Sequence, residues 1–141
     1  MIVGTDTKPL RIGRLAQEVG INLETVRFYE RQGLLPRPPR NASGYRLFPG
    51  DAKRRLKFIK RTQELGFSLS EIRDLLALRV SRRTTSAEIR KRTEAKISDI
   101  EGKIKSLDSM PKSLLKLVRS CDGCAQVSAC PILESLDRED G

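Results

Sequence analysis

Residues 97–118 carry a stripe of apolar side chains that recurs at alternating steps of three and four positions. Pro111 occupies one position of the stripe, and the others are Ile97, Ile100, Ile104, Leu107, Leu114 and Val118. This spacing predicts the a and d positions of a coiled-coil helix, with Lys, Asp and Glu between them. The alternative is that the stripe packs on the chain's own N-terminal domain, but a helix of about 30 residues is roughly 45 Å long, too long for that small domain to cover. We therefore expect the stripe to be a dimer seam, kinked or interrupted at Pro111.

The region before this stripe predicts a helix-turn-helix. In residues 11–32 apolar side chains recur at helical spacing until Gly20 and Asn22 interrupt the pattern. Gly20 is typical of a helix C-cap, and Asn22 is typical of the N-cap of a following helix. Two short helices joined by a glycine-containing turn form a helix-turn-helix, although many small helical domains show the same pattern.

The next segment predicts a wing. Prolines between residues 36 and 39 exclude helix, and the turn at Asn41–Gly44 lies between short extended runs. We expect a two-stranded wing closed by Tyr45–Phe48. Three arginines would lie on this wing: Arg37, Arg40 and Arg46.

Three further helices are expected. Residues 50–65 form a strongly basic amphipathic segment. A capping box at Ser68–Glu71 predicts a helix that continues to about Leu78. After a polar linker at residues 79–85, a second capping box at Thr85–Glu88 opens the longest helical stretch.

The charge is unevenly distributed along the chain. Residues 1–92 carry a net charge of +12 and residues 93–141 a net charge of −2. A concentrated positive surplus is typical of a module that binds phosphates, with an ordinary solvated basic surface as the alternative. The N-terminus lacks a signal pattern and no run of eighteen apolar residues occurs, so we expect the protein to remain in the cytoplasm.

Several stretches together resemble the MerR family of bacterial regulators. They are IGRLAQEVGINLETVRFYERQGLL, SGYRLF, FIKRTQELGFSLSEIRDLL and CDGCAQVSACPILESL, which extend the resemblance from Lys8 to about Leu136. The resemblance implies a mainly α fold. A winged helix-turn-helix domain at residues 8–80 would precede a dimerisation helix at residues 85–119. A metal-binding loop and a short helix would follow at residues 120–137.

The resemblance also implies a set of DNA-contacting side chains on the second helix and the wing: Thr25, Arg27, Tyr29, Arg37, Tyr45 and Arg46. Arg27 would enter the major groove, where a guanidinium can form two hydrogen bonds to guanine. The wing residues would contact the DNA backbone and fix the register. As in the family, the protein would act as an activator or repressor. Its homodimer would distort the promoter DNA so that RNA polymerase can engage the promoter.

The three cysteines of the chain lie within ten residues. Cys121, Cys124 and Cys130 are clustered around a Gly123 turn, which in a cytoplasmic protein indicates metal or redox chemistry. The chain contains no histidine, which removes the usual second kind of zinc ligand. Soft thiolates select ions such as Cu(I), Ag(I) and Hg(II).

Position 86 bears on the choice of ion. By resemblance, divalent sensors of the family place a further cysteine at this position, or at Thr85 if the register shifts by one, and donate it across the dimer. The copper, silver and gold sensors carry serine there. Ser86 therefore favours a monovalent ion, Cu(I), Ag(I) or Au(I), held by Cys121 and Cys130. Cys124 leaves open a second possibility, a trigonal Hg(II) or Pb(II) site made of three loop thiolates.

Two other classes of protein fit the sequence less well. Iron–sulfur redox regulators of this family have four loop cysteines, whereas this chain has three. A thiol enzyme is not expected either, because a Cys–His nucleophile pair requires a histidine.

Overall fold

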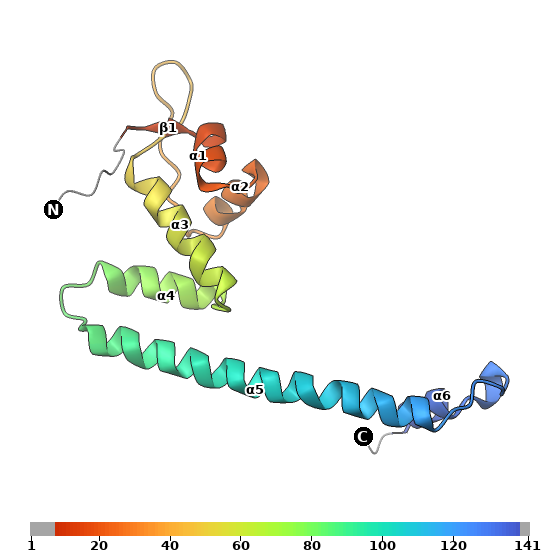
Figure 1. The fold of residues 1–141 in the computed structure, drawn as a ribbon. Helices are drawn as coiled ribbons and strands as arrows, with labels where there is room; N and C mark the ends of the chain where they lie inside the picture. Colours follow the sequence, from red (N-terminus) through yellow and green to blue (C-terminus); the bar gives the residue numbers. More distant parts are fainter. Residues whose placement is uncertain (1–7, 139–141) are drawn as a thin grey trace. The chain divides into compact units, whose positions relative to one another are not determined.

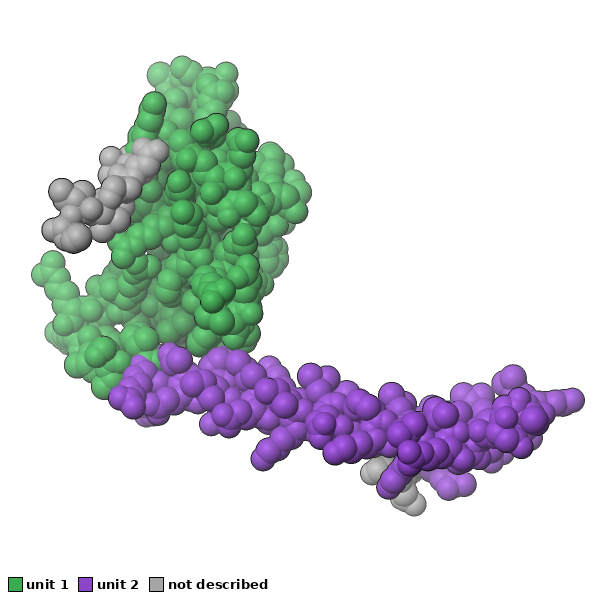
Figure 2. Space-filling view, in the orientation of Figure 1, with its two compact units in different colours: residues 1–89 green, residues 90–141 purple. Residues whose placement is uncertain are grey.

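The structure is a computed structural model that describes residues 8–138, and it is mainly helical (Figure 1). The described residues fall into two compact units, one ending at Ile89 and one beginning at Arg90 (Figure 2). The mainly α fold expected from the sequence is confirmed. Residues 1–7 belong to the N-terminal segment from which no signal sequence is expected, and they lie outside the described range.

The helix-turn-helix forms where the capping residues predict it. Helix α1 spans Ile12–Val19 and ends at Gly20, whose φ of 80° is the left-handed conformation that glycine adopts without a steric penalty. Helix α2 spans Leu23–Arg31. Its N-cap is Asn22, whose Oδ1 accepts a 2.7 Å hydrogen bond from the amide of Thr25.

The next two helices also agree with the sequence. Helix α3 spans Asp51–Glu64, and helix α4 spans Leu69–Arg79. At the start of α4 the Ser68 hydroxyl accepts from the amide of Glu71, while the Glu71 carboxylate accepts from the amide of Ser68. This reciprocal pair is the predicted capping box, and it satisfies two amides that the helix itself leaves unpaired.

A single apolar core holds the first unit together. Helices α1 to α4, strand β2 and the turn after α2 contribute buried side chains to it. They are Leu15, Ala16, Val19, Val26, Tyr29, Leu34, Leu35, Phe48, Ala52, Leu56, Ile59, Ile72 and Leu76. Because α1 and α2 both pack on this core, their relative orientation is fixed by burial.

The wing differs from the sequence prediction in its strand pairing. Strand β2, Leu47–Phe48, pairs antiparallel with strand β1, Leu10–Arg11, which the sequence analysis did not predict. Within the wing itself, the structure has one isolated antiparallel bridge, between Arg40 and Arg46. The wing is therefore attached through β2 to the residues that lead directly into α1.

Helix α5 spans Ser86–Arg119 and is followed by a short 3₁₀ turn, Val127–Ala129, and by helix α6, Pro131–Leu136. Of the two effects expected from Pro111, an interruption of the helix is wrong, because α5 continues through it, and a kink stays a prediction. Proline lacks the amide that would bond four residues back, but the turns on both sides keep their own hydrogen bonds. No helix within residues 8–138 is both long and apolar enough to cross a membrane.

The predicted seam lies along α5. Ile97, Ile104, Leu107, Leu114 and Val118 are 50–61% exposed in the single chain. Ile100 is partly buried.

Candidate nucleic-acid interface and metal loop

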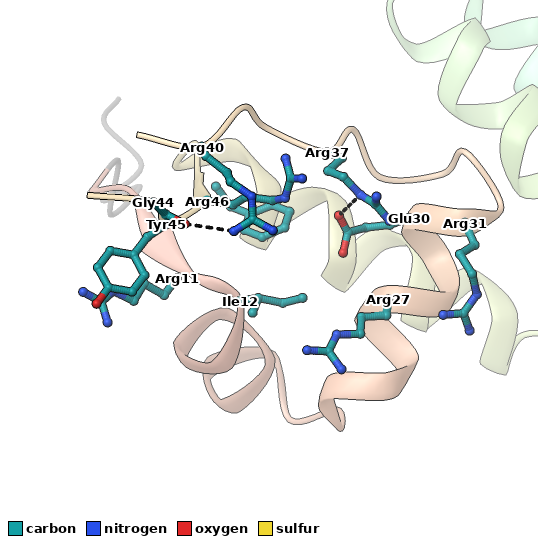
Figure 3. A pocket seen from close by; sticks show the side chains of 11 residues that line it. Arg11, Ile12, Arg27, Glu30, Arg31, Arg37, Arg40, Gly44, Tyr45 and Arg46 are labelled. Carbon is teal, nitrogen blue, oxygen red and sulfur yellow. Dashed lines mark hydrogen bonds and ion pairs between the residues drawn. The ribbon is translucent and has the colours of Figure 1, made fainter. Parts of the chain in front are cut away.

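A groove of about 400 Å³ opens on the first unit between the helix-turn-helix and the wing. Arginine side chains from β1, α2 and the wing surround it (Figure 3). They are Arg11, Arg27, Arg31, Arg37, Arg40 and Arg46. This concentration of guanidinium groups creates a strongly positive surface suited to the phosphates of a nucleic acid.

Arg11 and Tyr45 form a stacked pair at one end of the groove. The guanidinium carbon of Arg11 lies 3.7 Å from the centroid of the Tyr45 ring, which is a cation–π contact. Arg11 belongs to β1 and faces Leu47 in the strand pairing, so the sheet brings it beside the wing. Tyr45 is 46% exposed, and its predicted DNA contact remains a prediction.

Two arginines donate hydrogen bonds to backbone carbonyls of the wing segment. Arg40 donates to the carbonyl of Gly44 at 2.9 Å, and Arg46 donates to the carbonyl of Pro38 at 2.7 Å. Asn41 completes the turn, because its Oδ1 accepts from the amides of Ser43 and Tyr45, both at 3.0 Å. The predicted DNA contact of Arg46 is untested, and the contact with Pro38 gives Arg46 a structural role in addition.

Thr25 and Arg27, two of the predicted DNA-contacting residues, lie near the start of α2. The Thr25 hydroxyl donates to Asn22 at 2.8 Å, and Arg27 pairs with Glu24 at 3.0 Å. The Arg27 side chain is half exposed and lines the groove. Arg27 therefore lies on the surface of the groove, and its contact with the bases stays a prediction.

The structure buries Tyr29, and its predicted DNA contact stays a prediction. Its side chain is 4% exposed and belongs to the core, and its hydroxyl donates a 2.6 Å hydrogen bond to Gln63 of α3. Tyr29 lies one helical turn beyond Val26 and therefore shares its buried face. Burial raises the pKa of Tyr29 above its usual value of 10.0, and the carboxylate of Glu64 adds to the increase.

Sequence reasoning missed Arg11 and Arg31 as groove residues. Arg31 lies one turn after Arg27 on α2, so helical periodicity alone could have placed both on one face. Arg11 carried no such signal, because its position depends on the pairing of β1 with β2.

The cysteines lie in the second unit, between α5 and α6. The amide of Cys121 bonds to Val118 at the end of α5, and Cys130 is the N-cap residue of α6. Between them Gly123 has a φ of 82°, and the amide of Cys124 bonds to Oδ1 of Asp122 at 2.9 Å. All three thiols are free, with Cys124 exposed and the other two partly buried.

The chemistry of this donor set fits a thiophilic ion, because soft thiolates prefer soft metal ions. In the described part of the chain, no three Cys, Asp or Glu side chains are grouped as a ready metal site. Ser86, the first residue of α5, belongs to the first unit, and its side chain is exposed.

The fold and the groove define a winged helix-turn-helix protein with a strongly positive surface. Residues 10–78 match the MerR HTH family regulatory protein domain, and residues 53–117 match the domain described as MerR, DNA binding. The chain is 42% identical to a mercuric resistance operon regulatory protein of Bacillus cereus, over 89% of this chain and 96% of the relative.

Solved structures give the same result. The transcription regulator PbrR691 from Ralstonia metallidurans, in complex with lead(II), matches with a TM-score of 0.78 and 38% identity, over 90% of this chain and 98% of that one. HiNmlR, a MerR family regulator that lacks the sensor domain and is bound to promoter DNA, matches with a TM-score of 0.57 and 25% identity, over 80% and 83%. This chain belongs to the MerR family of transcription regulators, which are not enzymes, and to its metal-responsive branch.

Proposed function

We propose that the chain acts as a homodimer in the cytoplasm, where it binds promoter DNA and switches transcription by RNA polymerase when a thiophilic ion binds the loop at residues 121–130. The observation that carries the proposal is the gathering of all the thiols of the chain into this one loop. In the same chain, the first unit presents a groove lined by six arginines.

The apolar seam supports the homodimer. Five of its side chains are at least half exposed in the single chain, and a helix surface of this kind is stabilised when it packs against another apolar surface. A second copy of α5 offers a stripe of the same length and spacing.

For the ion, we propose Cu(I), Ag(I) or Au(I), bound by Cys121 and Cys130. These two residues flank the loop, one at the end of α5 and one at the start of α6. Two thiolates are sufficient for a soft monovalent ion, and the hydroxyl of Ser86 is a poor ligand for such ions. A bound ion would tie the end of α5 to the start of α6.

A second candidate is a sensor of Hg(II) or Pb(II). Cys124 favours it, because this residue supplies a third thiol in the same loop. The names of two similar proteins also favour it, since one regulates a mercuric resistance operon and the other was solved with lead(II).

The output of the switch would be a change in DNA shape. A dimer bound to a palindromic site can have two conformational states. One of these states can stabilise bent or untwisted DNA. The ion shifts the equilibrium only by the difference between its affinities for the two states. No step of this mechanism requires catalysis.

The test is an anaerobic titration of the reduced protein in which Cu(I), Ag(I), Hg(II), Pb(II) and Zn(II) compete for binding. It is combined with transcription in vitro from a promoter that the protein binds. We expect the monovalent ions to bind most tightly and to activate transcription. Activation by Hg(II) or Pb(II) without activation by Cu(I) or Ag(I) would replace the first candidate by the second. Transcription that responds to no ion would contradict both.

A further inference from the structure

The arginine-lined groove contains a carboxylate. Among the side chains of the described residues that line it, Glu30 is the one acid beside six arginines. Figure 3 shows Glu30 on α2, directed toward Arg37. An acid on a surface that must accept phosphates needs an explanation, because it repels them.

The Glu30 carboxylate is buried and ion-paired. Its side chain is 4% exposed, and its Oε2 lies 3.3 Å from Nε of Arg37. By contrast, Glu24, which pairs with Arg27 on the same helix, is 72% exposed. Only the Glu30 end of the pair is shielded from water and salt, so its charge is screened less than that of the exposed Glu24.

The geometry restrains Arg37 without covering it. The Arg37 side chain is 55% exposed, and its contact with Glu30 uses Nε. The two terminal nitrogens take no part in this contact, while the side chain is held at Nε. Without Glu30, the same side chain would become a mobile, fully effective positive charge beside five others.

We propose that Glu30 is a positioning residue that determines DNA specificity by acting through Arg37. It cancels most of the attraction that Arg37 would otherwise exert on the phosphates of any duplex. The inference rests on the binding of promoter DNA that is part of the proposed function.

The test is Glu30→Gln, which keeps the shape of the side chain and removes its charge. Two duplexes serve as probes: one enriched by the wild-type protein from a randomised pool, and a scrambled duplex of equal length and composition. For the scrambled duplex, we expect affinity to rise at least threefold. The slope of log K against log salt should become steeper by about 0.9, the value for one more neutralised phosphate. Preference for the enriched duplex should fall.

Two controls separate this effect from a change in overall charge. Glu64→Gln changes the net charge equally at a site outside the groove, where Glu64 pairs with Arg61, and we expect less than half of the effect. Arg37→Ala in the Glu30→Gln protein should return the salt slope to the wild-type value. Arg37→Ala in the wild-type protein should lower the affinity for the scrambled duplex, because it leaves the Glu30 carboxylate unpaired in the groove.

An unchanged salt slope and unchanged affinity for the scrambled duplex in Glu30→Gln would overturn the inference. A parallel loss of affinity for both duplexes would also overturn it, because a purely structural role predicts that result. If the wild-type protein enriches no sequence from the pool, both the inference and the proposed binding to a promoter fail.

Discussion

The hydroxyl of Tyr29 donates a hydrogen bond of 2.6 Å to Oε1 of Gln63, and this bond joins helix α2 to helix α3. Both partners belong to the first unit, and the Tyr29 ring is part of its core. The bond therefore fixes the position of the helix that presents Arg27 and Arg31 to the groove.

Tyr29→Phe should lower the free energy of unfolding by about 1 kcal/mol at neutral pH, because it removes this bond. It should also change the response to alkali. The pKa of Tyr29 is raised in the folded protein, so above about pH 10 the unfolded chain loses its proton first. The free energy of unfolding then falls as pH rises, and Tyr29→Phe should reduce that fall. Urea unfolding between pH 7 and pH 11 measures both effects; equal slopes in the two proteins above pH 10 would contradict the argument.

Arg27→Ala should abolish selectivity for the operator without affecting the dimer. A bidentate contact between a guanidinium and guanine contributes about 1–3 kcal/mol of discrimination. The ion pair of Arg27 with Glu24 is largely exposed and contributes little to folding. Anisotropy titration with specific and scrambled duplexes gives the selectivity, and thermal unfolding checks the fold. An unchanged affinity for the operator would show that Arg27 does not contact the bases.

Ile100→Asp combined with Leu107→Asp should prevent dimerisation. Two carboxylates in a buried apolar interface cost several kcal/mol, because charges lose their hydration there. The matched control is Ser98→Asp with Ser106→Asp, which adds the same charge to α5 at polar positions between the seam residues. Sedimentation equilibrium distinguishes the two; a stable dimer in the seam variant would mean that another surface mediates pairing.

Much of the fold could be predicted because its signals are local. Gly20, Asn22 and the Ser68–Glu71 capping box mark helix ends through contacts within a few residues, so the sequence alone identifies them. Strand β1 has no such signal. It is two residues long and exists because Leu10 pairs with Phe48, 38 positions away in the sequence.

The candidate site was only partly predictable for the same reason. Arg27 follows from its place on an exposed helix face, whereas the roles of Arg11 and Glu30 depend on contacts with the wing. Tyr29 was assigned to DNA by position in a family motif, although its spacing from Val26 puts it on the buried face. At this position the helical period predicts the burial that the structure shows.

The thiols give the last prediction. Cys121 and Cys130 flank the loop at the ends of two helices, so a bound ion can hold those ends together. Cys121→Ser or Cys130→Ser should therefore abolish metal-induced transcription while promoter binding persists, because the DNA groove belongs to the other unit.

Cys124 is exposed beside the Gly123 turn, and Cys124→Ser should spare a response to Cu(I) or Ag(I) that needs two thiolates. The same change should damage a response to Hg(II) that needs three, and Ser86→Cys should strengthen a divalent response by adding a thiol. Transcription in vitro with each ion measures these responses, and gel shifts without metal serve as the control for DNA binding. If the Cys124→Ser protein loses its copper and silver response, the ion is held by three thiolates and the two-coordinate site must be abandoned.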